Sequence, residues 1–237
     1  GGDIGTGTNG HLADLDITAA SIIISGATVR LADDDEVVVR TSTFTGAVTL
    51  TTSVTIDTDS GVGGGTDNSL TFASTVNGTA GGAAESLTLT TGGGDITFTG
   101  VVGATDPLGA VTINAANNVT TSAAFSAASV NQAVTGTGTT QIGGLLTTTA
   151  VAGVTLNAAT VDLNAGITTN GGPVVLNAGA GGVDLAAGQT ITTTAAADSG
   201  TTSGLIDINV SGTGTVNLAG NLVTTGADHA TAAATAS

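Results

Sequence analysis

Several side chains that ordinarily stabilise or equip a protein are missing from this chain of 237 residues. It contains no cysteine, methionine, tryptophan, tyrosine or lysine, and it has only four phenylalanines and two prolines. Without cysteine the chain has no disulfide bonds, which by itself does not fix its compartment. Apolar residues still make up 40% of the sequence, so we expect a hydrophobic core built from Val, Leu, Ile and Ala.

Positive charge is nearly absent as well. The chain has two cationic side chains, Arg30 and Arg40, and 18 carboxylates, so its formal net charge is -16 at pH 7. Because binding to phosphates needs clustered Lys and Arg, this balance excludes nucleic acid as a partner and opposes binding to anionic lipid. No apolar run approaches the roughly 20 residues of a membrane span, so we predict no such span.

Three short motifs recur along the second half of the chain. An aliphatic residue followed by Thr-Thr begins at Val119, Leu146, Ile167, Ile191 and Val223. The pattern aliphatic-x-aliphatic-Asn begins at Val111, Val154, Val174 and Ile206, and a Val-x-Leu pattern begins at Val161, Val183 and Val216. Each motif alternates aliphatic with other residues and is bounded by Gly, Asn, Asp or Ser, which predicts a short β-strand.

All three series lengthen at the same place. In each series the last interval between motif starts contains clearly more residues than the interval before it. For example, the interval from Ile191 to Val223 is longer than that from Ile167 to Ile191. Every long step spans residues 195–204, so one insertion in one turn of the repeat explains all three. We expect this segment to protrude as a loop from a corner of the repeat.

A unit of about 20–24 residues with three short strands cannot bury a face alone, and it calls for stacking on equivalent neighbours. The pattern therefore predicts an all-β fold, a parallel β-helix (β-solenoid), with equivalent Val and Leu residues aligned inside. We expect the Thr-Thr pairs on a solvated outer face. A corner ladder of amides is predicted for Asn114, Asn157, Asn177 and Asn209. The alternative is tandem immunoglobulin-like β-sandwiches, although phase-locked repeats and the lack of Trp and Tyr argue against it.

Composition divides the chain into three regions. Residues 1–43 hold both arginines and are predicted to form an N-terminal cap or assembly region, or, over 12–40, a first irregular set of coils. Residues 44–226 are predicted to form the β-solenoid repeats, less regular in the first half, and residues 227–237 a flexible tail. The sequence begins at Gly1 without Met, so we expect a processed chain or a piece of a longer one.

Two stretches carry a family resemblance. "SLTLTTGGGDITFTGVVGATDPLGAVTINA" (86–115) and "VTLNAATVDLNAGITTNGGPVVLNA" (154–178) resemble the β-strand repeats of large bacterial surface and secreted proteins. These are the filamentous-haemagglutinin-like adhesins and the autotransporter-type passengers. The resemblance covers roughly residues 44–226, and it implies a secreted right-handed parallel β-helix that serves adhesion, surface coating or filament building.

No catalytic constellation stands out. Polysaccharide lyases with a β-helix need a cation, a role open only to Arg30 or Arg40, and glycosidases need two facing carboxylates. Asp162 and Asp184 occupy equivalent positions in successive repeats, which favours a solvated ladder over an acid/base pair. His11 and His229 lie in polar sequence near the ends, where no partner motif accompanies them. We therefore predict that the chain is not an enzyme.

One polar stretch indicates a metal. In "DTDSGVGGGTDN" (57–68), the side chains of Asp57, Asp59 and Asp67 flank a glycine-rich loop. Calcium prefers six to eight oxygen ligands from such loops, so these three residues are the candidate Ca²⁺ ligands. A long solvated turn is the simpler interpretation of the same residues.

The sequence as a whole predicts a structural protein of the cell surface or extracellular space. A rigid β-solenoid would serve surface coating, adhesion or head-to-tail filament assembly, with other copies of itself or further repeats of a longer chain as partners. A surface glycan or host ligand is a further possible partner. The alternative function is a calcium-dependent adhesion or glycan-binding module.

Overall fold

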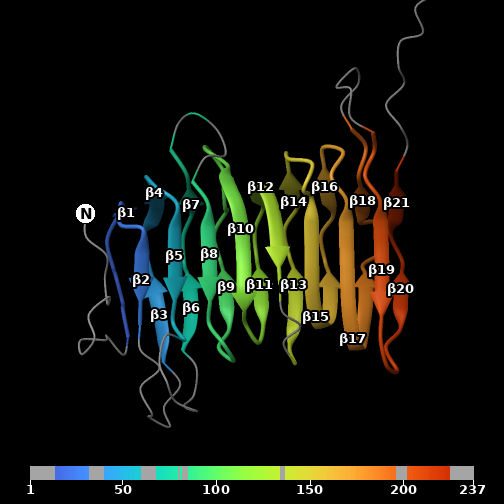
Figure 1. Cartoon of the computed structure of the whole chain (residues 1–237), viewed down its shortest axis with the longest axis horizontal. Coiled ribbons are helices and arrows are strands. Elements are labelled where there is room, and N and C mark those ends of the chain that lie inside the picture. Colours follow the sequence, from blue (N-terminus) through green and yellow to red (C-terminus); the bar gives the residue numbers. More distant parts are fainter. Residues whose placement is uncertain are drawn as a thin grey trace, which may run out of the picture.

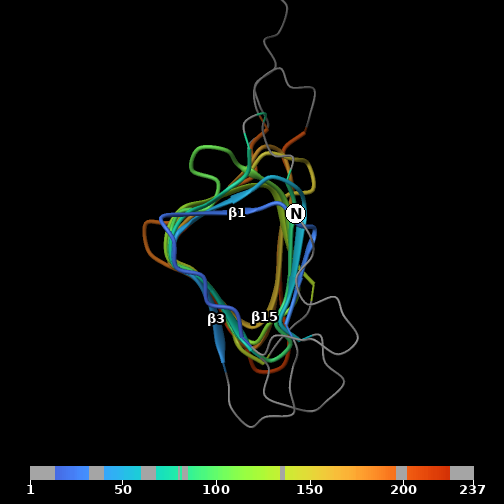
Figure 2. The same ribbon diagram turned by 90° about the vertical axis from the view of Figure 1, so that its left-hand side faces the viewer.

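The structure is a computed structural model, and it describes residues 14–31, 40–59, 68–79, 81, 85–133, 137–195 and 202–224. Within these ranges the chain contains strands and turns and no helix, hence no helix that could cross a membrane. The strands stack along one axis, and the two ends of the described chain lie at opposite ends of the stack (Figure 1). Seen along that axis, the coils superpose in a roughly triangular outline (Figure 2).

The first face of the triangle is a column of parallel strands one coil apart. Val102 joins β7 to β12 through isolated parallel bridges. The strands are β1 (Ser21–Ile24), β4 (Ala47–Leu50), β7 (Val76–Asn77), the start of β12 (Phe125–Gln132), β14 (Leu146–Thr148), β16 (Ile167–Thr169), β18 (Thr190–Thr192) and β21 (Asn221–Val223).

The second face follows the same principle. Its strands are β2 (Thr28–Arg30), β5 (Val54–Asp57), β8 (Leu87–Thr90), β10 (Leu108–Ala115), the end of β12, β15 (Val154–Leu163), β17 (Val174–Leu185) and β19 (Ile206–Val210).

The third face completes each coil. Its strands are β3 (Thr41–Phe44), β6 (Ser69–Phe72), β9 (Ile96–Phe98), β11 (Val119–Thr121), β13 (Thr139–Ile142), the second halves of β15 and β17, and β20 (Val216–Leu218). The strands β15 and β17 are long because they continue around the corner between the second and third faces. Every strand pairing among the described residues is parallel, so the predicted β-solenoid is confirmed and the β-sandwich alternative is wrong.

Two of the predicted columns are confirmed residue by residue. Val154 pairs with Val174, which pairs with Ile206. Val161 pairs with Val183, which pairs with Val216. Register is thus the same on both sides of residues 195–204, as one insertion requires. The central part of that insertion, 196–201, lies outside the described residues.

The Thr-Thr series needs correction at both of its ends. Leu146, Ile167 and Ile191 do stack, but Val119 lies on the third face, where it pairs with Ile96 and Thr140. At the other end Ile191 pairs with Leu222, one residue before the predicted Val223. Three-residue Thr-rich strands occur on more than one face, so the motif does not identify a face.

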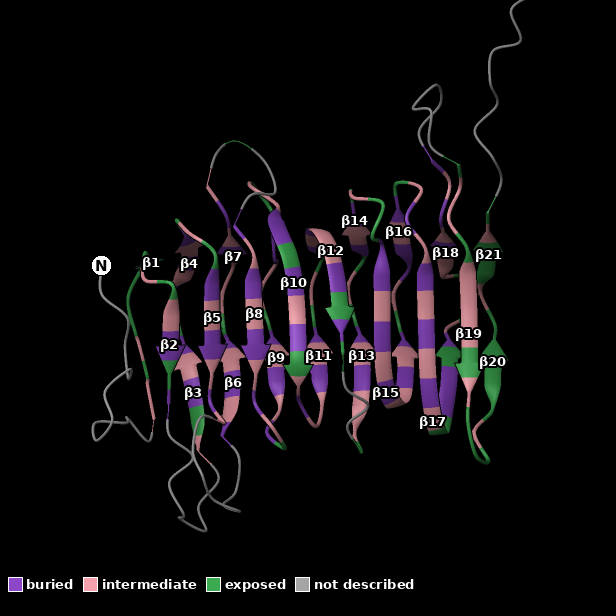
Figure 3. Cartoon of the chain, viewed as in Figure 1, coloured by how far each residue is buried: buried purple, intermediate pink, exposed green. Residues whose placement is uncertain are grey.

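The expectation that the Thr-Thr pairs lie outside is also wrong. Successive side chains of a strand point to opposite faces, so in the pairs after Val119, Leu146, Ile167 and Ile191 only the first Thr points outward. The second Thr, as in Thr148 and Thr169, points into the solenoid and is buried. Figure 3 shows this alternation along most strands.

The coils begin before the predicted boundary at residue 43. Within residues 14–31, Ile17 bridges to Phe44, β1 pairs with β4 and β2 pairs with β5. This part of the predicted N-terminal region is therefore a coil of the solenoid. The predicted tail, 227–237, lies outside the described residues.

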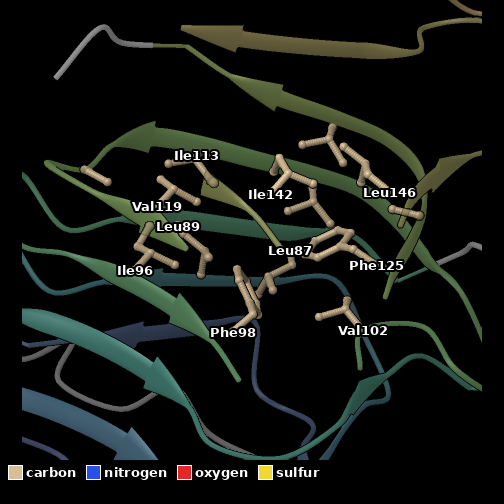
Figure 4. Packing of buried hydrophobic residues seen from close by; sticks show 14 of the residues in the cluster. Leu87, Leu89, Ile96, Phe98, Val102, Ile113, Val119, Phe125, Ile142 and Leu146 are labelled. Carbon is tan, nitrogen blue, oxygen red and sulfur yellow. The ribbon is translucent and has the colours of Figure 1, made fainter. Parts of the chain in front are cut away.

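The interior is a continuous apolar core. Side chains from all three faces pack together in it, as the close-up around Phe98 and Phe125 shows (Figure 4). All four phenylalanines form one row. The rings of Phe44, Phe72 and Phe98 are stacked with centroids 5.3 and 5.1 Å apart, and Phe125 meets Phe98 edge-on at 5.3 Å. Burying each large apolar side chain contributes about 1.5–3 kcal/mol, so the core accounts for most of the stability of the stack.

Candidate functional site

An asparagine ladder runs up the second face near its corner with the third. The Nδ2 atom of Asn177 donates to Oδ1 of Asn157 at 2.7 Å, and Nδ2 of Asn209 donates to Oδ1 of Asn177 at 3.0 Å. The amide of Asn177 thus donates to the coil before it and accepts from the coil after it. The predicted ladder is confirmed for these three residues.

The fourth predicted member is not in this ladder. Nδ2 of Asn114 donates to Oγ1 of Thr90 at 3.3 Å. The next coil carries no Asn at this position, and Nδ2 of Asn157 donates instead to the backbone carbonyl of Gln132. One coil without the amide therefore interrupts the ladder.

A second ladder lies on the outer side of the third face. Asp162 and Asp184 are register partners on successive coils. Nε2 of Gln141 donates to Oδ2 of Asp162 at 3.1 Å, and Nδ2 of Asn217 donates to Oδ1 of Asp184 at 2.7 Å. Each of the two carboxylates thus accepts a hydrogen bond from an amide on a neighbouring coil.

Buried threonines close the corners of the coils. Oγ1 of Thr91 donates to the carbonyl of Gly94 at 2.9 Å, and Oγ1 of Thr58 makes the equivalent bond to Asn68 at 2.6 Å. On another corner, Thr169 bonds the carbonyl of Gly172, and Oγ1 of Thr193 bonds the carbonyl of Gly204 at 2.6 Å. One type of hydrogen bond thus closes both short corners and long ones.

The candidate calcium ligands lie partly within the described chain. Asp57 ends β5, where it pairs in register with Arg30 of β2 and Thr90 of β8. Its Oδ1 accepts a hydrogen bond from the backbone N–H of Asp59 at 3.1 Å. The third candidate, Asp67, lies outside the described residues, so convergence of the three carboxylates stays a prediction.

Other residues singled out from the sequence also lie outside the described ranges. These are His11 and His229. In the part of the chain that the structure describes, no three His, Asp or Glu side chains gather closely enough to hold a metal ion.

Glu85 is a buried carboxylate that the sequence did not indicate. Its carboxylate accepts hydrogen bonds from the hydroxyl of Thr79 and from the Thr79 backbone N–H, the latter at 3.1 Å. These bonds, the hydroxyl first, hold the pKa of Glu85 below its ordinary value and outweigh the opposing effect of burial. The side chain thereby closes the turn between β7 and β8.

The last described coil is the most exposed apolar part of the stack. Val216, Leu218 and Leu222 are 47%, 41% and 42% exposed, whereas their partners one coil earlier are almost fully buried. Figure 3 shows the change from buried to exposed colours at β20 and β21. The inner columns thus continue into a coil whose apolar side chains remain open to solvent.

Comparisons with protein-family models, with curated proteins and with solved structures gave no match. The resemblance to bacterial β-strand-repeat proteins therefore rests on the sequence motifs alone.

Proposed function

We propose that this chain is a structural, non-enzymatic protein of the cell surface or extracellular space. Its rigid solenoid serves surface coating, adhesion or head-to-tail filament assembly. The observation that carries the proposal is the last described coil with its exposed apolar side chains, because such a strand edge pairs with another copy or with further repeats of a longer chain.

The first described coil carries the same columns at the other end of the stack, with Ile22 and Val29 themselves only 6% and 4% exposed. Ile17, Ile22 and Val29 continue these columns on the third, first and second faces. An apolar cavity of about 150 Å³ lies among them, lined also by Leu15 and Phe44. The last coil of one copy therefore adds onto the first coil of the next.

Such a contact joins two different surfaces and does not close on itself, so it builds a filament and not a dimer. A non-catalytic role agrees with the outer faces, where Asp162 and Asp184 are engaged by amides. A chain without lysine, cysteine or methionine also suits long exposure outside the cell, since it has no thiol or thioether to oxidise.

Sedimentation of the full-length chain over a range of concentrations tests the proposal. The average mass should rise with concentration for the wild type and for Val151→Asp, which changes an exposed apolar residue away from the last coil. Leu218→Asp should remain monomeric, because it places a charge on the proposed contact. A wild-type chain that stays monomeric at high concentration would rule the filament out.

A further inference from the structure

The two ends of the solenoid carry different polar side chains on the outer side of the second face. In β2, Val29 is buried, so the side chains of Thr28 and Arg30 on either side of it point outward, and Arg30 is exposed. In β19, Asp207 and Asn209 hold the corresponding outer positions of the last described coil. The strands β2 and β19 lie toward opposite ends of the stack (Figure 1).

Strand register relates these residues to one another. An unbroken series of parallel pairings leads from Thr28, coil by coil along the second face, to Asp207. Arg30 and Asn209 each follow two residues later in their strands, so they too hold equivalent positions. A second copy that continues the register therefore places its Thr28 opposite Asp207, and its Arg30 opposite Asn209.

The hydrogen-bonding groups at these two ends are complementary. Within the asparagine ladder each Nδ2 donates to the coil before it, as Nδ2 of Asn209 donates to Oδ1 of Asn177 at 3.0 Å. Each Oδ1 is then directed to a donor on the coil after it, and for Asn209 that coil belongs to the next copy. A guanidinium only donates and an ionised carboxylate only accepts, so Arg30 suits Asn209 and Asp207 alike.

The charges at the two ends are also opposite. Arg30 is the one cationic residue of the segment 14–31, and Asp207 is the one carboxylate residue of the segment 202–224. Diagonal neighbours on adjacent strands are within reach of a long side chain, so a guanidinium opposite Asn209 also reaches the carboxylate of Asp207. In a chain with a net charge of -16, most contacts between copies bring like charges together, and this contact does the opposite.

Apolar contacts alone do not determine how two copies are rotated relative to each other. Each of the three faces carries aliphatic inward side chains at both ends of the stack. Rotating one copy by one face would therefore still bring aliphatic side chains together, but it would separate Arg30 from Asp207. Selection among such alternatives comes from polar groups that the wrong arrangement leaves without partners.

We infer that Arg30 of one copy binds the carbonyl of Asn209 and the carboxylate of Asp207 at the end of the copy before it. This contact rests on the proposed filament, and it names the partner as a second copy of this chain. It selects the rotation in which all three faces continue from one copy into the next.

Sedimentation of full-length variants at low ionic strength tests the contact. Arg30→Glu should weaken association by about tenfold or more, because it opposes two carboxylates across the contact. Arg30→Glu/Asp207→Arg should restore most of the lost association, since opposite charges meet again. The matched control is Arg30→Glu/Asp106→Arg, which has the same net charge but changes a loop in the middle of the stack. It should associate as weakly as Arg30→Glu.

The outcomes separate this contact from the filament itself. A wild-type chain that does not associate would refute both. If Arg30→Glu associates as well as the wild type, the filament stands and the contact at Arg30 is wrong. Equal recovery in the charge swap and in its control would also overturn the contact, because net charge alone would then explain the effect. If Arg30→Glu does not fold, Asp207→Arg gives the same test from the other end, since it opposes two arginines.

Discussion

The coils between residues 41 and 101 and those between residues 146 and 192 share three faces but differ in what fills them. In the first group, one column of the third face is Phe44, Phe72 and Phe98. In the second group, the same column holds Leu163 and Leu185. Aromatic rings can stack here because neighbouring strands lie about 4.8 Å apart, close to the 5.1 and 5.3 Å between the ring centroids.

Coil length differs between the two groups as well. On the first face, Val48 pairs with Val76, and Val76 bridges to Val102. Leu146, Ile167 and Ile191 occupy the same face in the second group, and they follow one another at shorter intervals along the sequence. The extra residues of the first group lie between strands, so strand register does not depend on coil length. The predicted repeat unit describes the second group and is too short for the first.

The largest expected effect on stability comes from shortening a side chain in the inward column of the third face. Phe72→Ala should lower the free energy of unfolding by about 3–5 kcal/mol, and Leu185→Ala by about 2–5 kcal/mol, because each leaves a cavity in a filled column. Loss of Phe72 should be the more costly, since both neighbouring rings lose a stacked partner.

Denaturant unfolding followed by circular dichroism measures both effects. Thr71→Ala, on the outer side of the same strand as Phe72, serves as the control and should change little. An effect of Phe72→Ala no larger than that of Thr71→Ala would show that the aromatic row does not stabilise the first group.

The next effect concerns the long corner that Thr58 closes in the first group. If Asp57, Asp59 and Asp67 bind calcium with a Kd of about 0.1–1 mM, about 10 mM calcium stabilises the fold by about 1.4–2.7 kcal/mol. The melting temperature should then rise in calcium relative to chelator, and Asp57→Asn/Asp59→Asn should abolish the rise. Equal melting temperatures with calcium and with chelator would support the interpretation of this segment as a solvated turn. They would also rule out the alternative function of a calcium-dependent module.

In the second group the asparagine ladder should contribute less. Asn177→Ala removes two amide hydrogen bonds on a half-exposed surface, and we expect a loss of about 1 kcal/mol. A double-mutant cycle with Asn157→Ala isolates the bond between the two side chains. Strict additivity of the two single changes would show that the ladder is not energetically coupled.

Glu85 makes the first group sensitive to acid. Its folded pKa lies below the ordinary value of 4.5, so its stabilising contribution is complete above that value and is lost as the pH falls through the folded pKa. The stability difference between the wild type and Glu85→Gln should therefore be constant near neutral pH and shrink below about pH 4. Asp106→Asn, a charge change in a nearby loop, is the control, and a difference that does not change with pH would contradict this role.

The smallest effect is expected at the long corner that follows the second group, between Thr193 and Gly204. Deleting residues 196–201 should change stability by less than about 0.5 kcal/mol, since loop length has a weak entropic effect. Thr193→Val, which removes the hydroxyl that closes this corner, should cost about 1 kcal/mol. A deletion more damaging than Thr193→Val would show that the inserted residues pack as part of the core.

The columns of the second group could be predicted from the sequence because aligning repeated motifs such as "VTLN" and "VVLN" shows which residues of successive coils pair with each other. In the first group the motifs are weaker, but Phe44, Phe72 and Phe98, which are register partners on the third face, recur at an almost constant interval, which was a usable signal of coil length. Burial of the second Thr was missed because threonine suits an outer strand by composition. For Thr169 and Thr193 the folded corner supplies the carbonyl that accepts the hydroxyl's hydrogen bond, and the sequence does not show this corner.

Glu85 and Gln132 could not be placed from sequence for a different reason. Whether a lone polar residue points inward depends on the turns on either side, and no repeat fixes these turns. The exposure of the apolar side chains in the last coil could not be predicted from the sequence either, because their residue types match those of the buried coils before them.

The threonine hydroxyl that closes a corner has a consequence for how such a chain can change over time. Thr169 closes a short corner with Gly172, and Thr193 closes the equivalent, much longer corner with Gly204. Strand register is unaffected by the difference, so foreign peptide segments can be grafted between the hydroxyl and its acceptor without altering the scaffold. The sequence of such a corner can then diversify while the coils remain constant.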